Sequence, residues 1–255
     1  MKFEDKKVVI TGAAGVIGTW LTQAFAREGA HLCLADNRAE RLKRLADALN
    51  MPSERLLLQN TDLCDDAALA ALVACVADAW NAPDILINCA GIYPFGKLLE
   101  TDNAVWDRIM GVNLRAMFVL TRDFAKAMIA HGIKGNIIFI GSGAARNLRA
   151  NGIPYCVSKT ADERLCKGFA LELAPHGIRV NTVEPGFAPG SEITDFPEGY
   201  VERLIAGIPL GRTSGPDDAA NAVMFLCSEQ AGFITGATLS VDGGNSVGKR
   251  TVQQG

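Results

Sequence analysis

The segment VVITGAAGVIG, residues 8–18, joins an apolar, β-branched run to three evenly spaced glycines and the start of a helical pattern. β-branched runs favour strands, and glycines at their ends mark a turn into the next element. At a strand-to-helix turn, glycine lets backbone N–H groups approach a pyrophosphate at the positive end of the helix. The segment therefore predicts a dinucleotide-binding turn whose contacts are Gly12, Gly15, Val16, Ile17 and Gly18.

The same alternation of short apolar runs and longer helical patterns continues along the 255-residue chain. Strands are expected at 7–11, 30–35, 55–59, 84–88, 136–140, 178–183 and 238–241. Helices are expected at 18–28, 39–50, 65–80, 103–131, 153–174 and 217–228. Strands that are apolar throughout are typical of a parallel sheet buried on both faces. We expect an α/β fold: a Rossmann-type doubly wound seven-stranded parallel sheet with helices on both faces, in a single domain over residues 1–255.

Composition and charge narrow the possible partners. The chain has 25 basic and 28 acidic residues, a net charge of −3, and no block of like charges, so no nucleic acid or membrane partner is expected. The longest charge-free stretch, residues 8–26, is interrupted by glycine and threonine, and the N-terminus does not fit a secretory signal. We expect a cytoplasmic protein. The seven cysteines form no C-x-x-C pair and lie among apolar neighbours, and the histidines lie far apart, so neither disulfides nor a metal site is expected.

A carboxylate at the end of the second strand suggests which dinucleotide binds. Asp36 follows Gly18 by eighteen residues, near the spacing at which a carboxylate accepts hydrogen bonds from the adenosine ribose. A carboxylate there repels the 2′-phosphate of NADP, so NAD is the expected cofactor and NADP the less favoured one. Arg38 complicates this prediction because its side chain could turn toward a phosphate. The alternative role for Asp36 is to cap the next helix.

A tyrosine, a lysine and a serine indicate acid–base chemistry. Tyr155 and Lys159 are four residues apart on a predicted helix, and so share one face. An ammonium beside a phenol stabilises the phenolate, which a general base needs at physiological pH. Ser142 ends the fifth predicted strand, at the carboxyl edge where open α/β sheets bind ligands. Its hydroxyl could hold a substrate oxygen there.

In this order the motifs resemble those of the short-chain dehydrogenase/reductase family, over nearly the whole chain. The matching stretches are TGAAGVIG at 11–18, NTDL at 60–63, NCAG at 88–91, VNL at 112–114, Ser142, YCVSK at 155–159, PG at 185–186 and ITGATLSVDGG at 234–244. The resemblance implies a catalytic tetrad of Asn113, Ser142, Tyr155 and Lys159. In it, Tyr155 exchanges a proton with the substrate oxygen, Ser142 orients that oxygen, Lys159 holds the nicotinamide ribose, and Asn113 anchors a water.

The resemblance also implies further cofactor contacts. They come from the residues after the third, fourth and sixth strands: Asp62 and Leu63 at the adenine, Asn88, Ala90 and Gly91 along the cofactor, and Pro185 and Gly186 near the nicotinamide. The sequence departs from the family pattern at two points. Gly15 lies one residue earlier than the middle glycine usual in the single-domain branch, and Cys89 stands where a second asparagine is common.

The expected function is NAD-dependent hydride transfer between nicotinamide and a small secondary alcohol or ketone. Two alternatives stay open: a non-catalytic dinucleotide-binding sensor, and epimerase-type chemistry, which the Gly15 spacing favours. The substrate region is expected at 92–95, 144–151 and a lid within 185–210. Arg146 and Arg149 either bind an anionic substrate or solvate a surface turn.

Two predicted helices carry more apolar residues than one buried stripe needs. Examples in 103–131 and 153–174 are Met117, Phe118, Leu120, Phe124, Cys166, Phe169 and Leu171, and part of this apolar surface is expected to be buried against another subunit. In the family the two helices form a four-helix interface within tetramers. A homo-oligomer, either a tetramer or a dimer, is therefore expected.

Overall fold

The computed structural model describes residues 2–190 and 199–248. Seven strands in these ranges form one sheet in the order β3-β2-β1-β4-β5-β6-β7. Every neighbouring pair of strands is parallel. The strands are β1 (Lys7–Thr11), β2 (His31–Asp36), β3 (Leu56–Asn60), β4 (Ile85–Asn88), β5 (Asn136–Ile140), β6 (Arg179–Pro185) and β7 (Thr238–Val241). The predicted doubly wound parallel sheet is confirmed, with strand ends within two residues of those expected.

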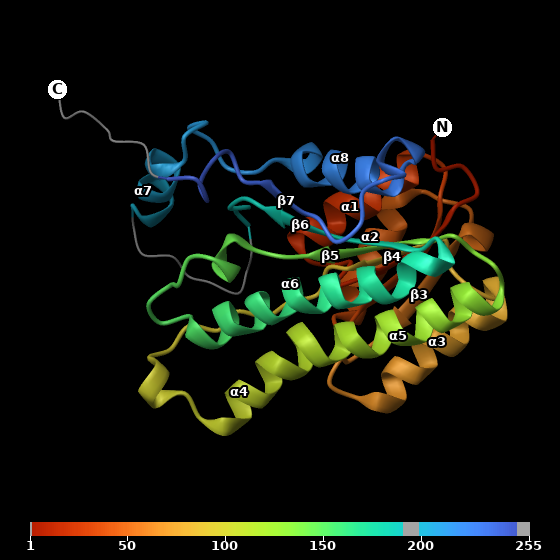
Figure 1. Cartoon of the computed structure of the whole chain (residues 1–255), viewed down its shortest axis with the longest axis horizontal. Coiled ribbons are helices and arrows are strands. Elements are labelled where there is room, and N and C mark those ends of the chain that lie inside the picture. Colours follow the sequence, from red (N-terminus) through yellow and green to blue (C-terminus); the bar gives the residue numbers. More distant parts are fainter. Residues whose placement is uncertain (1, 191–198, 249–255) are drawn as a thin grey trace.

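Helices cover both faces of this sheet (Figure 1). The helices are α1 (Val16–Arg27), α2 (Ala39–Leu49), α3 (Asp66–Trp80), α4 (Asn103–Met110), α5 (Ala116–Ala130), α6 (Ile153–Leu173), α7 (Tyr200–Gly207) and α8 (Pro216–Cys227). Residues of α1, α2 and α8 pack in one apolar core, and residues of α3, α5 and α6 pack in the other. The sheet lies between these two layers.

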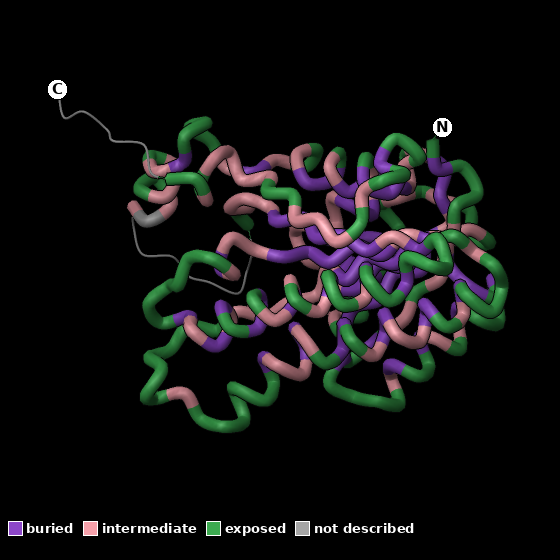
Figure 2. The backbone as a smooth tube through the Cα atoms, in the orientation of Figure 1, coloured by how far each residue is buried: buried purple, intermediate pink, exposed green. Residues whose placement is uncertain are grey.

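The central strands supply both cores, because successive side chains on a strand point to opposite faces. On β1, Val9 enters the core beneath α3, α5 and α6, whereas Val8 and Ile10 enter the opposite core. All three side chains are fully buried, which explains why β1 is apolar throughout. Figure 2 shows this buried centre, with exposure rising toward the outer helices and the loops.

The helical stretch expected at 103–131 is present over residues 103–130 and contains one π-helical turn. A π-helical turn, Gly111–Arg115, separates α4 from α5. A π-helical turn has i→i+5 bonds and is common at functional sites. The residue in the middle of this turn is Asn113, whose side chain is fully buried against the loop after β4. The sequence did not predict this turn, because apolar periodicity does not register one extra residue in a turn.

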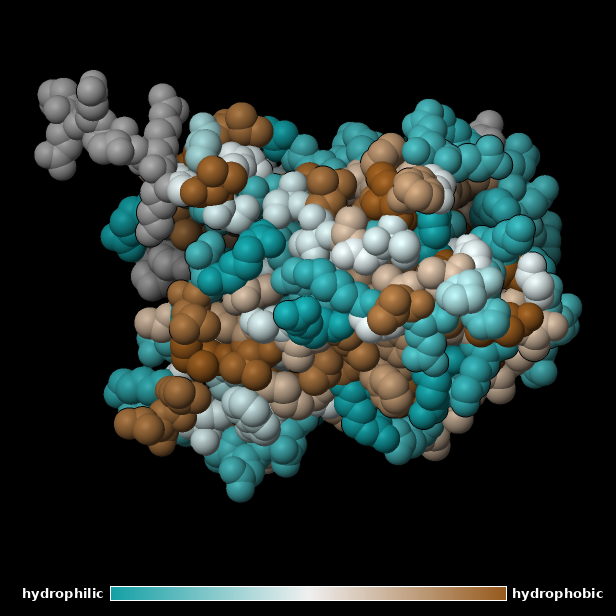
Figure 3. Space-filling model, in the orientation of Figure 1, coloured by the Kyte–Doolittle hydropathy of each residue, from teal (hydrophilic) through white to brown (hydrophobic). Residues whose placement is uncertain are grey.

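The apolar residues of α5 and α6 divide between the core and the surface. Of the seven examples, four belong to the core: Met117, Leu120, Phe124 and Cys166. Phe118 is 40% exposed and Leu171 is 82% exposed. Figure 3 shows apolar side chains gathered over the region of α4 to α6. An apolar surface is therefore present on these helices, and Phe118 and Leu171 contribute to it.

The lid expected within 185–210 is described in part. Residues 191–198 lie outside the described residues, and α7 forms part of the remainder. Of the seven cysteines, four are buried, Cys75 and Cys89 are partly buried, and Cys64 is exposed. No helix in the described ranges has the length and apolar character needed to cross a membrane.

Candidate active site

Two glycines make the turn after β1 possible. Gly12 has a φ of +65°, and a Cβ there would lie 2.6 Å from Cα of Ala90. A Cβ on Gly18 would lie 2.1 Å from the carbonyl oxygen of Gly12. Both distances are too short for a side chain, so the turn folds tightly against the segment after β4 only with glycine at these positions. Gly15 closes the turn by donating its N–H to the Gly12 carbonyl at 3.0 Å.

The N-terminus of α1 fits an anionic ligand. Val16 and Ile17 begin the helix after Gly15, and within the described residues no side chain caps it and no acidic residue lies in its first turn. The first N–H groups of a helix have no intrahelical partner and carry partial positive charge. The expected contacts Gly12, Gly15, Val16, Ile17 and Gly18 therefore surround a site that suits a pyrophosphate.

Asp36 lies beside this turn, as the sequence predicts, but it is already paired. Its side chain is 4% exposed, and Oδ2 accepts a hydrogen bond from the N–H of Ala14 at 3.0 Å. Arg38 donates from Nε to Oδ1 at 2.9 Å and from the guanidinium to Oδ2 at 3.1 Å. These hydrogen bonds raise the pKa of Arg38 above its ordinary value. Asp36 is not the cap of α2, because Arg38 occupies the N-cap position.

The end of β4 meets the glycine turn and α6. Thr11 Oγ1 accepts hydrogen bonds from the N–H groups of Cys89 and Ala90 at 3.2 and 3.3 Å. A Cβ on Gly91 would lie 3.7 Å from Asn113 Oδ1 and 3.8 Å from Lys159 Nζ, so Gly91 lies between these side chains. Asn88 points its amide into the core, where Nδ2 donates to Thr121 Oγ1 at 2.9 Å. The backbone after Asn88, more than its side chain, faces the site.

Asn113 connects the loop after β4 to α6. Its Oδ1 accepts from the N–H of Ile92 at 2.9 Å, and its Nδ2 donates to the carbonyl oxygen of Ile92 at 2.9 Å and to Ser158 Oγ at 3.0 Å. Ser158 Oγ in turn donates to the carbonyl oxygen of Tyr155 at 2.8 Å. Because all three bonds of the amide go to protein atoms, Asn113 positions the helix that carries Tyr155.

Tyr155 and Lys159 lie together on α6. Lys159 Nζ is 6.0 Å from the centroid of the Tyr155 ring, and the lysine side chain is only 4% exposed. Nζ donates to the carbonyl oxygen of Ile140 at 3.0 Å and to Asp162 Oδ2 at 2.9 Å. Burial lowers the pKa of Lys159, but Asp162, with smaller contributions from Tyr155 and Cys89, outweighs burial and raises it. The lysine is thus held as an ammonium beside the phenol.

Asp162 was not predicted as a site residue from the sequence. It follows Lys159 by three residues, and its side chain is fully buried. Residues three apart on a helix are neighbours, so the spacing alone could have drawn attention to the pair. Tyr93 was missed as an individual contact: its ring meets the ring of Tyr155 edge-on, with centroids 5.8 Å apart. That contact depends on the path of the loop after β4, which no sequence spacing reveals.

Ser142 follows β5 by two residues and sits at the same edge of the sheet. Its Oγ accepts a hydrogen bond from the N–H of Ala144 at 3.2 Å. The residue that ends β5, Ile140, supplies the carbonyl oxygen that Lys159 binds. The serine loop and the Tyr155–Lys159 helix are therefore joined at the carboxyl end of β5.

The remaining predicted cofactor positions lie after β3 and β6. Asp62 is exposed and accepts from the N–H of Cys64 at 3.0 Å, whereas Leu63 is buried in the core. Pro185 ends β6, and Gly186 donates its N–H to the carbonyl oxygen of Val241 at 2.8 Å. All the predicted positions therefore lie at or after the carboxyl ends of parallel strands, although Asn88 and Leu63 turn their side chains into the core.

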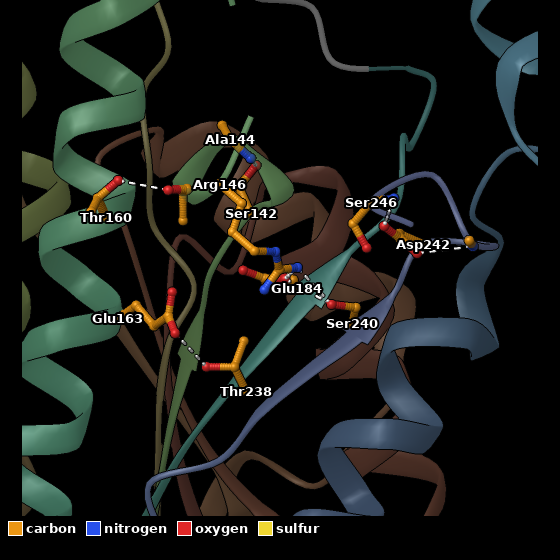
Figure 4. A network of polar contacts seen from close by, with 12 residues as sticks. Ser142, Ala144, Arg146, Thr160, Glu163, Glu184, Thr238, Ser240, Asp242 and Ser246 are labelled. Carbon is orange, nitrogen blue, oxygen red and sulfur yellow. Dashed lines mark hydrogen bonds and ion pairs between the residues drawn. The ribbon is translucent and has the colours of Figure 1, made fainter. Parts of the chain in front are cut away.

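Arg146 forms an ion pair within the protein that the sequence did not predict. Its guanidinium pairs with Glu184 and donates to Ser240 Oγ at 2.8 Å (Figure 4). Ser240 Oγ also donates to Glu184 Oε2 at 2.9 Å. The Glu184 side chain is 2% exposed, so this ion pair is largely buried on the carboxylate side. These contacts join the loop after Ser142 to β6 and β7. They also neutralise the charge of Arg146, one of the two arginines that are candidates for binding an anionic substrate.

The described residues contain no group of three or more His, Cys, Asp or Glu that could hold a metal ion. Organic acid–base groups and backbone N–H donors are what the site offers. A dinucleotide fits the glycine turn and the uncapped helix, because the first turn of α1 offers backbone N–H donors for phosphate oxygens.

Comparisons with known proteins agree with this arrangement. A family model described as Enoyl-(Acyl carrier protein) reductase matches residues 12–246. Galactitol 2-dehydrogenase (L-tagatose-forming) of Cereibacter sphaeroides is 38% identical over 244 residues, which cover 93% of this chain and 94% of that protein. Sorbitol dehydrogenase of the same organism is 31% identical over 256 residues, covering 96% and 99%.

A solved structure is also similar along nearly its whole length. The crystal structure of 3-ketoacyl-(acyl-carrier-protein) reductase from Brucella melitensis, complexed with NADH, matches with a TM-score of 0.86 at 33% identity. The match covers 95% of this chain and 99% of that chain. With the fold, the glycine turn and the Tyr155–Lys159 pair in place, the chain belongs to the short-chain dehydrogenase/reductase family.

Proposed function

We propose that this protein is an NAD-dependent dehydrogenase that interconverts a secondary alcohol and a ketone, with Tyr155 as the general acid and base. The observation that carries the proposal is the buried Lys159 ammonium, 6.0 Å from the Tyr155 ring, at the sheet edge that also carries the glycine turn. Neither a sensor nor a structural protein needs a proton-transfer group with a charged neighbour at this position.

Each residue of the site has a separate role in the proposed reaction. Bound nicotinamide supplies the hydride acceptor or donor. Tyr155 takes the hydroxyl proton during oxidation and returns it during reduction, while the Lys159 ammonium stabilises its phenolate. Ser142 orients the substrate oxygen through Oγ. Asn113 keeps α6 in place through Ile92 and Ser158.

The cofactor assignment to NAD rests on Asp36. Its carboxylate lies at the end of β2, next to the glycine turn, and disfavours a 2′-phosphate there. Arg38 offsets part of this charge through its paired hydrogen bonds. NAD therefore remains the proposed cofactor, with a preference over NADP that is moderate in size.

For the substrate we propose a neutral polyol. Both comparison dehydrogenases named above act, by their names, on polyols. In this chain the guanidinium of Arg146 is neutralised by Glu184, so it offers little attraction to an anionic substrate. Hydroxyl groups along a polyol can bond to Ser142 and to the backbone groups around it.

A coupled screen of NAD reduction tests the reaction and its substrate class together. Galactitol and sorbitol are compared with a phosphorylated polyol and a 2-hydroxy acid at equal concentrations. The neutral polyols should give kcat/KM values about ten-fold or more above the anionic compounds, the difference expected when charged groups lack a partner. Preference for an anionic compound would contradict the substrate class. Absence of NAD reduction with every alcohol and of NADH oxidation with every carbonyl would favour the sensor, and retained cofactor without net redox change would favour epimerase chemistry.

We also propose that the protein is a homo-oligomer, assembled through α4, α5 and α6. A groove of about 570 Å³ on this face is lined by Met110, Leu114, Phe118 and Leu165, among others. Apolar surface of this kind is a common site of subunit contact. The cytoplasmic location remains a prediction from the sequence.

A further inference from the structure

A fully buried carboxylate contacts the lysine of the proposed active site. Asp162 is 0% exposed, and its Oδ2 accepts a hydrogen bond from Lys159 Nζ at 2.9 Å. Its other oxygen, Oδ1, is buried without a hydrogen-bond partner among the described residues. Moving a carboxylate out of water is costly, and a buried ion pair seldom repays that cost in stability. The position of Asp162 therefore points to a role in the chemistry.

Few other charges face the pair. Tyr155 lies on the same helix, Cys89 approaches from the segment after β4, and Cys166 lies one turn further along α6. Burial raises the pKa of Cys89 to about 12 and that of Cys166 to about 11, so both thiols are uncharged at neutral pH. β5 contributes only the carbonyl oxygen of Ile140, and β6 contributes the uncharged Thr182 beside Cys166.

The neighbouring carboxylate points elsewhere. Glu163 pairs with Lys167 at 2.7 Å and accepts from Thr238 Oγ1 at 3.3 Å, on the side of α6 that faces β7 (Figure 4). Among the described residues, Asp162 is thus the one carboxylate whose charge acts on Lys159.

This charge has two opposing effects on the reaction. It stabilises Lys159 as an ammonium, which burial alone would disfavour. It also cancels much of the positive charge that stabilises the phenolate of Tyr155, because the two oxygens and Nζ form a nearly neutral pair. Lys159 is therefore fixed in position with its pKa raised, but its effect on Tyr155 is weaker than that of an unpaired ammonium.

We propose that Asp162 is a positioning residue that holds Lys159 in place and offsets its charge, and so raises the pH at which Tyr155 begins to accept the substrate proton. The proposal rests on the dehydrogenase function proposed above, and it assigns Asp162 an effect on pH dependence that a purely structural carboxylate would lack.

The test is the pH profile of kcat/KM for alcohol oxidation in the wild-type protein and in Asp162→Asn. Asparagine keeps the shape and the acceptor for Lys159 Nζ but removes the charge. The acid limb of the profile should move to lower pH by about one unit, the size expected for one nearby buried charge. The control is Glu163→Gln, which removes a carboxylate from the next position of the same helix and should leave the limb in place.

A purely structural role gives a different result. If Asp162 were purely structural, Asp162→Asn would lower kcat at every pH, and the acid limb of its kcat/KM profile would stay at the wild-type pH. That outcome would overturn the proposal. Asp162→Ser, which is smaller and also uncharged, gives the same test if the asparagine variant does not fold. A shift of the limb to higher pH in either variant would also overturn it.

A second readout does not need turnover. Tyrosinate absorbance is measured against pH in the wild type and in Asp162→Asn, and again after adding Tyr155→Phe to each. Subtracting the second curve from the first leaves the signal of Tyr155 alone. In the Asp162→Asn background this difference signal should appear about one pH unit lower. If the wild type shows no dehydrogenase activity, the proposed function fails, while this titration still decides whether Asp162 controls Tyr155.

Discussion

Asp36 and Arg38 meet at the part of the site where the adenosine ribose is expected. Both oxygens of Asp36 are engaged by Arg38, and Oδ2 also accepts from Ala14. A ribose must therefore displace the guanidinium or share the carboxylate with it. The Arg38 side chain is 38% exposed, so the pair is partly screened by water and can exchange partners at modest cost. Cofactor choice thus depends on two residues that act in opposite directions.

Arg38→Ala should raise the preference for NAD over NADP. The ratio of kcat/KM with NAD to kcat/KM with NADP should rise about ten-fold, because Asp36 is freed to accept from the ribose and no guanidinium remains for a 2′-phosphate. Asp36→Ala should lower the same ratio, since Arg38 is released. Arg44→Ala, an exposed arginine later on α2, serves as the control and should leave the ratio unchanged. If neither Asp36→Ala nor Arg38→Ala changed the NAD-to-NADP ratio of kcat/KM, the result would show that this pair does not select the cofactor.

At the scale of elements, the start of α8 is stabilised by one carboxylate. Asp218 accepts from the N–H of Gly215 at 2.7 Å and pairs with both terminal nitrogens of Arg212. These contacts, chiefly the one with Arg212, lower the pKa of Asp218 to about 2. Since this value lies below the ordinary 3.8, ionised Asp218 stabilises the fold above pH 3.8, and the contribution is lost as the pH falls through about 2.

Asp218→Asn should lower the free energy of unfolding by about 1 kcal/mol at neutral pH, a figure reduced for solvent screening of the exposed arginine. The difference from wild type should shrink as the pH falls from 3.8 toward 2. Urea unfolding at several pH values measures it. Asp217→Asn, whose partner Arg27 lies on the surface, should change stability by less than about 0.5 kcal/mol. An Asp218→Asn deficit that persists unchanged at low pH would contradict the role of its charge.

Elements with strong local patterns were predictable, and contacts between distant segments were not. The bounds of β1, β5 and β7 follow from short β-branched runs between turn residues. The position of Asp36 follows because the carboxyl ends of parallel strands share one edge. The π-helical turn at Asn113 does not follow, because hydrophobic spacing tolerates one inserted residue. The Arg146–Glu184 pair does not follow either, since the two residues are 38 positions apart and meet only after β5 pairs with β6.

The whole molecule places its chemistry at one edge of the sheet. The glycine turn follows β1, Asp36 ends β2, Gly91 follows β4, Ser142 follows β5 and Gly186 follows β6. From β1 the chain adds β2 and β3 on one side and β4 to β7 on the other. The switch point between β1 and β4 is where doubly wound sheets bind ligands. Residues spread along most of the chain are thus brought to one site by the topology alone.

The assembly of the whole molecule is tested by its mass in solution. Light scattering after size exclusion should give a multiple of 27.1 kDa, the mass of one chain. Phe118→Glu places a charge on the apolar face of α5 and should shift the mass toward smaller species, because burying an unpaired carboxylate is unfavourable. Lys43→Glu, on the exposed face of α2, is the control and should leave the mass unchanged. A wild-type mass of 27.1 kDa would rule out the oligomer.

The most direct test of the central proposal compares wild type with Tyr155→Phe in two measurements on the same preparations: alcohol oxidation followed by NAD reduction, and NADH binding followed by fluorescence. Phenylalanine keeps the ring against Tyr93 and removes only the hydroxyl that moves the proton. The variant should lose kcat by a factor on the order of 10² to 10⁴ while its affinity for NADH stays within about three-fold of wild type. Turnover retained near the wild-type rate would contradict the account.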